Sequence, residues 1–378
     1  MRPRRWRSRL LGHHRSGCLQ FQYPSFTLFN RGKQYHFILQ FAMAPQQYAK
    51  DQPSGFTNRI ERVAIVGAGG NGVGSHMAKA LLATGKHSVT AISRVGSKNT
   101  LPKGINIARV DYDDESSLVS ALKGHQFLII TLSVMAPRET QGKLIAAAAK
   151  AGVPWVMPNC TGPDFINESL AKENLIGAGV RASTDAIEKA GVSSWIALVC
   201  GFWYGHSLAL GEGWFGFDFP NRKVTLIDDG KTRINTSTLE QCGRAIASLL
   251  SLKELPDDAS DTAPTISQWR NQPVYISSFL TSQRDMLDSV HKALGTKDAD
   301  WEIKYEPSEA RYKKGLELLK SGSHLGFGIC MYTRTFYPNG DGNFQDKLSN
   351  EVLGLHEENL DDATVNAIKL VDSGYSYR

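Results

Sequence analysis

Cysteine is scarce in this chain, and its spacing excludes two classes of small stabilised domain. The five cysteines among 378 residues form no Cys-x-x-Cys pair, and no Cys/His cluster has the spacing of a zinc site. We therefore expect neither a disulfide framework nor a metal site, and we expect Cys160 and Cys200 to be buried apolar residues. Long apolar runs are also missing: none approaches the ~18 residues of a membrane span, so the sequence predicts no membrane partner.

Acidic residues are absent from the first 50 positions, which hold nine lysines and arginines. Removing these nine from the chain's 43 basic residues leaves 34, against 37 acidic residues, in residues 51–378. The formal charge of +6 therefore belongs to the first segment alone. The slightly acidic remainder predicts no nucleic-acid partner.

Two interpretations fit the basic first segment. An arginine-rich, acid-free segment that contains serine is typical of a mitochondrial transit peptide. Alternatively, Met1 is an upstream start that adds no domain, because Met43 opens a short polar leader just ahead of the first predicted strand. We favour the second interpretation, which predicts a cytoplasmic protein. In both cases we expect residues 1–58 to form a mostly disordered leader.

From residue 62 onward, short apolar runs alternate with helical patterns. This alternation predicts an α/β fold built on a Rossmann-type doubly wound parallel sheet, because parallel strands need a covering helix between them. We expect the cofactor-binding domain to span residues 60–200. The predicted strands lie at residues 63–67, 88–93, 105–111, 126–133, 154–158 and 193–200, and the predicted helices at residues 75–85, 113–124, 137–152 and 182–191.

Beyond residue 200 the pattern changes, and aromatic residues and glycines crowd together. We expect a smaller mixed α+β substrate domain over residues 201–378. One helix, over residues 236–252 and capped by Ser237 and Glu240, is expected to pack on the first domain instead. The other predicted strands lie at residues 274–279, 301–305 and 329–337, and the other predicted helices at residues 282–295, 308–322 and 360–371, the first of these with a capping box formed by Ser282 and Asp285.

Five glycines stand in the eight positions from residue 67 to residue 74, between the first predicted strand and the first predicted helix. A turn of this kind cradles a pyrophosphate, because the helix N-terminus offers free N–H groups and the missing Cβ atoms let the phosphate approach. Gly67, Gly69 and Gly72 match the pattern G-x-G-x-x-G in the strand and helix context that supports it. The predicted cofactor-binding residues of the turn are Gly67, Gly69, Gly70, Asn71, Gly72 and Gly74.

An acid is missing where an NAD-binding protein needs one for the ribose hydroxyls: none occurs from residue 89 to residue 103. Arg94 ends the second predicted strand and Lys98 follows it, and both can pair with a 2′-phosphate. The sequence therefore predicts NADP(H) as the cofactor. The alternative is that Arg94 and Lys98 belong to an ordinary solvated loop.

Further candidate cofactor-binding residues follow the other strands, because ligands bind at the carboxyl ends of the strands in such sheets. Asp111 ends the third strand, where it either faces the adenine or simply begins the next loop. Leu132 and Ser133 end the fourth strand, and Asn159 follows the fifth. Asn159 either orients a substrate carbonyl or caps the following loop.

A resemblance emerges from these stretches together. The glycine turn, the strand end Ser93-Arg94 and the segments VMPNCTGPDF, WIALVCGFWYGHSLALG and TSTLEQCGRAIASLL resemble the NmrA-like and isoflavone-reductase-like branch of the atypical short-chain dehydrogenases, and more narrowly its fungal CipA-like subgroup. The resemblance implies an NADP-binding Rossmann domain followed by a smaller substrate domain. Members are NADPH-dependent reductases, often of secondary metabolism, or non-catalytic sensors that bind a dinucleotide and a protein partner.

Two features depart from that family. Its turn runs G-x-x-G-x-x-G, and here Gly67 and Gly70 match while the third site is Val73, so the turn looks one residue longer. Its reductases resemble one another in a catalytic lysine on the helix after the fifth strand, and the matching position here is Val180, beside Arg181. Nor does any tyrosine in residues 60–260 have a lysine four positions on, as the ordinary short-chain enzymes do.

Tyr204 is the predicted catalytic residue. It follows the sixth strand, and its phenol can give a proton to the oxygen that gains negative charge when a carbonyl or enone accepts a hydride. Trp203 is a candidate for stacking on the nicotinamide or substrate, and the alternative is that it only packs the domain junction. His206 is a candidate for exchanging protons, and the alternative is a surface or hydrogen-bonded histidine.

The sequence thus predicts an NADPH-dependent oxidoreductase that reduces a small aromatic or conjugated carbonyl or enone. The main alternative is a non-catalytic redox sensor that holds NADP and docks on a protein partner, and a third is non-redox use of the cofactor, such as isomerisation. A hydrolase has no support, because no Ser-His-Asp order with a nucleophile elbow occurs.

Overall fold

The computed structural model describes residues 25–30, 33–38, 47–133, 136–137 and 139–375. The chain divides into two units, residues 1–47 and residues 48–378. In the first unit, β1 (Ser25–Asn30) and β2 (Lys33–Ile38) pair as an antiparallel hairpin with Ser25 opposite Ile38. The other residues of the predicted leader as far as residue 46 lie outside the described residues.

A seven-stranded parallel sheet forms the centre of the second unit and confirms the predicted fold class. Its strand order is β13-β8-β7-β6-β3-β4-β5. The chain adds β4 and β5 on one side of β3 and then β6, β7, β8 and β13 on the other side, so the switch point lies between β3 and β6. In doubly wound sheets this switch point is where ligands bind. The strands are β3 (Arg62–Val66), β4 (Ser88–Arg94), β5 (Asn106–Val110), β6 (Phe127–Ile130), β7 (Trp155–Met157), β8 (Ser194–Val199) and β13 (Gln272–Tyr275).

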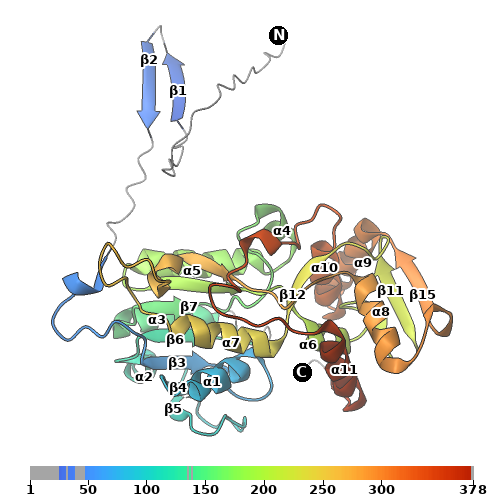
Figure 1. Ribbon diagram of the computed structural model, residues 1–378, viewed down its shortest axis with the longest axis horizontal. Helices are drawn as coiled ribbons and strands as arrows, with labels where there is room; N and C mark the ends of the chain where they lie inside the picture. The colour runs from blue at the N-terminus through green and yellow to red at the C-terminus, as the bar shows by residue number, and fades with distance from the viewer. Residues whose placement is uncertain (1–24, 31–32, 39–46, 134–135, 138, 376–378) are drawn as a thin grey trace. The chain divides into compact units, whose positions relative to one another are not determined.

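Helices cover both faces of this sheet (Figure 1). On one face α1 (Val73–Ala83) packs against α7 (Leu239–Leu250). On the other face α3 (Glu139–Ala151) lies between α2 (Glu115–Leu122) and α5 (Gly177–Ala190). Because the central strands are buried from both sides, they are apolar throughout, as in β6 with the sequence FLII.

The helix expected to pack on the first domain does so as α7. A Cβ on Gly243 would lie 2.7 Å from the carbonyl oxygen of His76, so only glycine lets α7 approach α1 this closely. The predicted cap of this helix is wrong by one residue. The Thr238 hydroxyl, not that of Ser237, accepts a hydrogen bond from Gln241 N–H, and Ser237 Oγ donates to the carbonyl oxygen of Cys200 instead.

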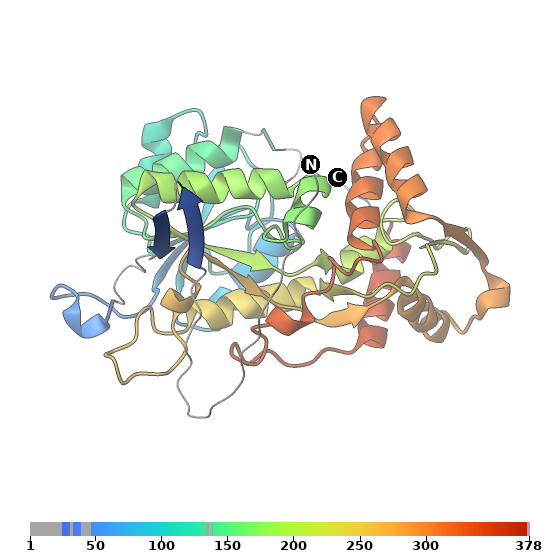
Figure 2. The same ribbon diagram turned by 90° about the horizontal axis from the view of Figure 1, so that it is seen from above.

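The later part of the chain builds a second, smaller lobe with its own aromatic core (Figure 2). Two three-stranded sheets take the orders β10-β11-β15 and β14-β12-β9. Their strands are β9 (Phe202–Trp203), β10 (Phe217–Asp218), β11 (Lys223–Ile227), β12 (Ile234–Ser237), β14 (Phe279–Thr281) and β15 (Glu302–Glu306). The helices are α4 (Glu168–Glu173), α6 (Tyr204–Ala209), α8 (Gln283–Leu294), α9 (Ser308–Lys320), α10 (Leu325–Thr335) and α11 (Leu360–Asp372), and the capping box of Ser282 and Asp285 at α8 is confirmed.

Two predicted strands are wrong, and some observed elements were not predicted. Residues 329–337, predicted as a strand from their aromatic and β-branched content, lie mostly in α10. This helix packs on α9 through glycines, since a Cβ on Gly326 would lie 2.5 Å from the carbonyl oxygen of Gly315. The predicted strand at residues 274–279 is split between β13 of the main sheet and β14 of the smaller lobe. The short helix α4 has no counterpart among the predicted elements.

Residues 48–58, predicted to be disordered, are part of the second unit and are hydrogen-bonded to the rest of it. Ala49, which begins the short 3-10 helix η1 (Ala49–Asp51), donates its backbone N–H to the carbonyl oxygen of Pro256 at 2.9 Å. The side chain of Asn58 donates to the carbonyl oxygen of Leu255 and accepts from its N–H, at 2.9 and 2.8 Å. The prediction fails here because the partners come from the loop after α7, about which the leader's own composition says nothing.

Candidate functional site

Two glycines of the turn are needed for packing. Gly67 follows β3 with φ +84°, and a Cβ there would lie 1.9 Å from the carbonyl oxygen of Thr131. A Cβ on Gly74 would lie 2.2 Å from Thr131 Oγ1 and 2.5 Å from the carbonyl oxygen of Gly67. The Thr131 hydroxyl is itself fixed, because it donates to the carbonyl oxygen of Val66 at 2.6 Å. These glycines therefore let β3, α1 and β6 approach one another at the switch point.

Two other glycines leave open space. A Cβ on Gly70 or Gly72 would meet no atom within 4 Å. Gly72 is the N-cap of α1, whose first turn contains no acidic side chain, so its N–H groups and dipole present positive potential. Gly69 differs, since its Cβ would lie 2.8 Å from that of Asn99. Of the predicted glycines, Gly70 and Gly72 are thus the two beside which a pyrophosphate has room, and the exposed Asn71 lies between them.

The pattern match therefore assigns one glycine incorrectly. In the G-x-G-x-x-G pattern the third glycine brings helix and strand together. The structure gives that task to Gly74 and not to Gly72. This fits a turn one residue longer than the family's pattern.

Three uncompensated cations lie at the carboxyl ends of β4 and β5. Arg94 ends β4, Lys98 follows it, and both are exposed. Arg109 on β5 pairs in register with Ser93 and donates to its hydroxyl at 2.9 Å. Among the described residues, the ion pairs involve none of these three. Sequence reasoning missed Arg109, because only the register of β4 and β5 brings it to this place.

The remaining predicted cofactor residues are held by the chain itself. Asn159 Oδ1 accepts from Leu132 N–H at 3.1 Å, and Asn159 Nδ2 donates to the carbonyl oxygen of Leu132 at 3.0 Å. This pair of bonds clamps the ends of β6 and β7, with the exposed Ser133 just beyond. Asp111 Oδ1 accepts from Asp113 N–H at 2.9 Å and so shapes the loop after β5. The geometry favours the loop interpretation for both Asn159 and Asp111.

Tyr204 lies inside the second core. Its side chain has no exposed surface, and its hydroxyl is 2.7 Å from Thr364 Oγ1. Its ring meets Phe279 edge to face at 5.3 Å, and burial raises its pKa well above the usual value for a phenol. A substrate has no surface on which to meet this hydroxyl, so the geometry argues against the predicted proton donor.

Trp203 and His206 pack beside Tyr204. Their rings meet edge to face at 5.5 Å, and His206 Nδ1 is 2.6 Å from the hydroxyl of Tyr375. Burial lowers the pKa of His206 to about 4, so the ring is neutral near neutral pH. These contacts fit the packing interpretation for Trp203 and the interpretation of His206 as a hydrogen-bonded histidine.

The position of the family's lysine is apolar. Val180 is buried on α5, and the next residue, Arg181, donates from Nε to the carbonyl oxygen of Phe165 at 2.9 Å and from Nη2 to that of Ile166 at 3.1 Å. The guanidinium is thus bound to the loop after β7. It also releases no proton near neutral pH.

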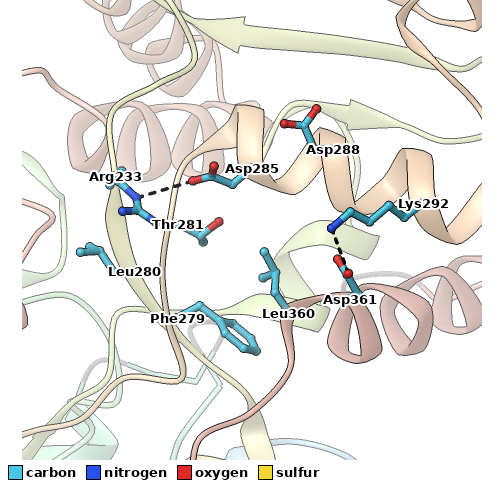
Figure 3. A pocket seen from close by; sticks show the side chains of 9 residues that line it. All are labelled: Arg233, Phe279, Leu280, Thr281, Asp285, Asp288, Lys292, Leu360 and Asp361. Carbon is cyan, nitrogen blue, oxygen red and sulfur yellow. Dashed lines mark hydrogen bonds and ion pairs between the residues drawn. The ribbon is translucent and has the colours of Figure 1, made fainter.

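A pocket of about 450 Å³ lies in the smaller lobe, between β14, α8 and the start of α11 (Figure 3). Arg233 lies 3.6 Å from Asp285, and Lys292 lies 3.1 Å from Asp361. Both cations of the pocket are thus paired with carboxylates that also line it. None of the predicted cofactor-binding residues lines this pocket.

The described part of the chain has neither a cluster of metal-ligating side chains nor a membrane-spanning helix. There, no three side chains of His, Cys, Asp or Glu converge to hold a metal ion. No helix of that part is long and apolar enough to cross a membrane.

The fold and the glycine turn define an α/β protein of Rossmann type. Residues 60–173 match the model of the NmrA-like family. Oxidoreductase aprR of Aspergillus flavus is 28% identical over 82% of this chain and 99% of its own length, and oxidoreductase poxI of Penicillium oxalicum is 22% identical over 77% and 89%.

Two solved structures share the fold over most of the chain. AtPrR2 with NADP+ and (+)pinoresinol superposes with a TM-score of 0.63, and an isoflavone reductase with 0.62, each at 18% identity over 82% of this chain and 99% of the other. The match over residues 60–173 and the shared fold thus agree with the resemblance to NmrA-like and isoflavone-reductase-like proteins.

Proposed function

We propose that this chain is an NADPH-dependent oxidoreductase that reduces a small aromatic or conjugated carbonyl or enone. The observation that carries the proposal is the open space beside Gly70 and Gly72, at the N-terminus of α1, together with the cations at the ends of β4 and β5, which form no ion pair among the described residues. Relatives called oxidoreductases, and a neighbour described as an NADPH-dependent quinone oxidoreductase from Escherichia coli, support it. A role in secondary metabolism and a cytoplasmic location belong to the same proposal.

NADP(H) fits the residues present. The first-turn N–H groups of α1 would hold the pyrophosphate, with no Cβ in the way at Gly72. Arg94 and Lys98 would pair with the 2′-phosphate, and Arg109 adds a third positive charge nearby. The bound nicotinamide would supply the hydride, while the chain supplies orientation and charge.

The test follows NADPH absorbance while quinones, enones and aromatic ketones are offered as substrates. We expect oxidation of NADPH with members of this panel, and slower oxidation when NADH replaces NADPH. Tight NADPH binding without oxidation by any member would overturn the reductase. A preference for NADH would instead overturn the cofactor assignment.

A non-catalytic NADP sensor is the second candidate, and two observations favour it. Val180 occupies the position of the family's lysine, and the phenol of Tyr204 is enclosed. A sensor would bind NADP(H) at the same turn and present a different surface to a protein partner in the loaded and empty states. It predicts cofactor binding with no turnover, which the same absorbance assay detects.

A further inference from the structure

Three polar side chains from distant parts of the chain meet beyond the carboxyl ends of β8 and β13. Asp164 lies in the loop after β7, Tyr275 ends β13, and Lys347 ends the 3-10 helix η4 (Gln345–Lys347). Tyr275 donates its hydroxyl to Asp164 Oδ1, and Lys347 Nζ donates to Asp164 Oδ2, both at 3.1 Å. Lys347 Nζ also lies 5.2 Å from the centre of the Tyr275 ring.

The loop places this cluster at the ligand-binding edge of the sheet. The carbonyl oxygen of Gly162 accepts from the N–H groups of Cys200 and Gly201, both at 3.1 Å, so the loop lies against the end of β8. Tyr275 pairs with Val199, the last residue of β8. The cluster therefore stands at the same carboxyl edge as the glycine turn, although on the far strands.

Asp164 is a buried carboxyl group that several hydrogen-bond donors hold in place. Its side chain is 2% exposed and accepts an N–H from Ile166 at 2.9 Å in addition to its two side-chain partners. A buried carboxylate persists only when paired and hydrogen-bonded in this way. Burial and Asp164 raise the pKa of Tyr275 well above the usual value, with a smaller effect from Asp346, so its phenol is a poor acid.

Lys347 is the solvent-exposed member of the cluster. Its side chain is 44% exposed, against 2% for Asp164. An ammonium carries three donors, and among the described hydrogen bonds Lys347 Nζ donates only to Asp164. The cluster thus anchors the ammonium on one side and leaves donors free on the other.

The cluster also adjoins the helix that lacks the family's lysine. Arg181, next to Val180 on α5, binds the carbonyl oxygen of Phe165, and Phe165 follows Asp164 directly. The loop that contains Asp164 and Phe165 therefore contacts both Arg181, beside the apolar position on α5, and the ammonium of Lys347.

We propose that Lys347 is the proton donor of the reduction and that Asp164 is its positioning residue; this rests on the proposed function. As the carbonyl carbon gains the hydride that NADPH gives up, the electron pair of the C=O bond moves to oxygen. The ammonium of Lys347 donates a hydrogen bond and then its proton to that oxygen, which yields the alcohol and NADP+. The neutral amine regains a proton from water, so the chain is unchanged after each turnover.

Replacement by arginine separates a proton donor from a structural ion pair. Lys347→Arg keeps the charge beside Asp164 but releases no proton near neutral pH. We expect Lys347→Arg and Lys347→Met to lower kcat about 10²–10⁴-fold while the Kd for NADPH stays at the parent value. Lys292→Met is the matched control, because Lys292 also lies 3.1 Å from a carboxylate, and it should keep the parent kcat. Parent-like kcat in Lys347→Arg would overturn the proton-donor role.

A binding probe makes the test independent of turnover. With saturating NADP+, 4-nitrophenol should bind to the parent as its coloured anion, and Lys347→Met should lose this binding while Lys292→Met keeps it. Equal binding by all three proteins would overturn the site. If the parent oxidises no NADPH, the reductase fails; loss of nitrophenol binding in Lys347→Met alone would then still support Lys347 as an anion-binding group.

Discussion

The glycine turn around Gly72 and the aromatic segment around Tyr204 use their polar groups in opposite ways. At the turn, the N-terminus of α1 opens onto empty space, and Arg94 and Lys98 have no carboxylate partners among the described residues. In the aromatic segment the hydroxyls are paired inside the fold: Tyr204 with Thr364 at 2.7 Å and Ser207 with Tyr332 at 2.6 Å.

The difference distinguishes a binding surface from a core. Groups that await a ligand remain solvated and unpaired, whereas polar groups of a core must find partners within the protein. Substitutions at the turn should therefore change ligand affinity, and substitutions in the aromatic segment should change stability.

The largest effect is expected where the turn itself is packed. In Gly74→Ala the new Cβ would lie 2.5 Å from the Gly67 carbonyl oxygen, which is backbone and cannot swing away. Overpacking of this kind should lower the free energy of unfolding by about 3 kcal/mol, measured by chemical denaturation.

Gly72→Ala is the matched control, since its Cβ would meet no atom within 4 Å. It should keep the parent stability and weaken NADPH binding, because the methyl group enters the space assigned to the pyrophosphate. Equal destabilisation by both changes would show that the turn has no open side.

The next effect concerns cofactor choice. Arg94→Ala should weaken NADPH binding by about 1.5–3 kcal/mol, the usual size of a charge-assisted hydrogen bond, and leave NADH binding nearly unchanged. Titration calorimetry with both cofactors measures the difference. Arg59→Ala, an exposed arginine that pairs with Glu61, serves as the control and should alter neither affinity. An equal loss of affinity for the two cofactors would show that Arg94 does not bind the 2′-phosphate.

The sequence predicts the sheet well and the site unevenly, for physical reasons. Strands buried on both faces must be apolar, so the order of strands and helices follows from composition and periodicity. Arg109 depends on strand register, and the contact of Asp164 with Lys347 spans 183 positions, so no local pattern contains either. Aromatic residues near glycines are typical of both a pocket wall and a core, and this ambiguity produced the interpretation of Tyr204.

Tyr204→Phe tests whether the aromatic segment is a core and not a binding surface. The change removes one hydrogen bond, yet Thr364 keeps Ser289 as a donor at 2.8 Å and the carbonyl oxygen of Leu360 as an acceptor. The free energy of unfolding should therefore fall by only about 1 kcal/mol. NADPH affinity and any turnover should match the parent. Tyr305 is 62% exposed, so Tyr305→Phe should change neither stability nor activity. A kcat loss of 10²-fold or more would restore Tyr204 as the proton donor.

The smallest effect is expected from removal of the basic first segment, residues 1–42. The contacts that hold residues 48–58 begin at Ala49, whose N–H binds Pro256, and include the side chain of Asn58 against Leu255. A chain that starts at Met43 keeps all of them, so its melting temperature and its NADPH affinity should equal those of the full chain. Further removal of residues 43–58 would leave the backbone groups of Leu255 and Pro256 without these partners, and should cost about 1–3 kcal/mol of stability. Loss of solubility or of NADPH binding already in the chain from Met43 would mean that residues 1–42 contribute to the folded protein.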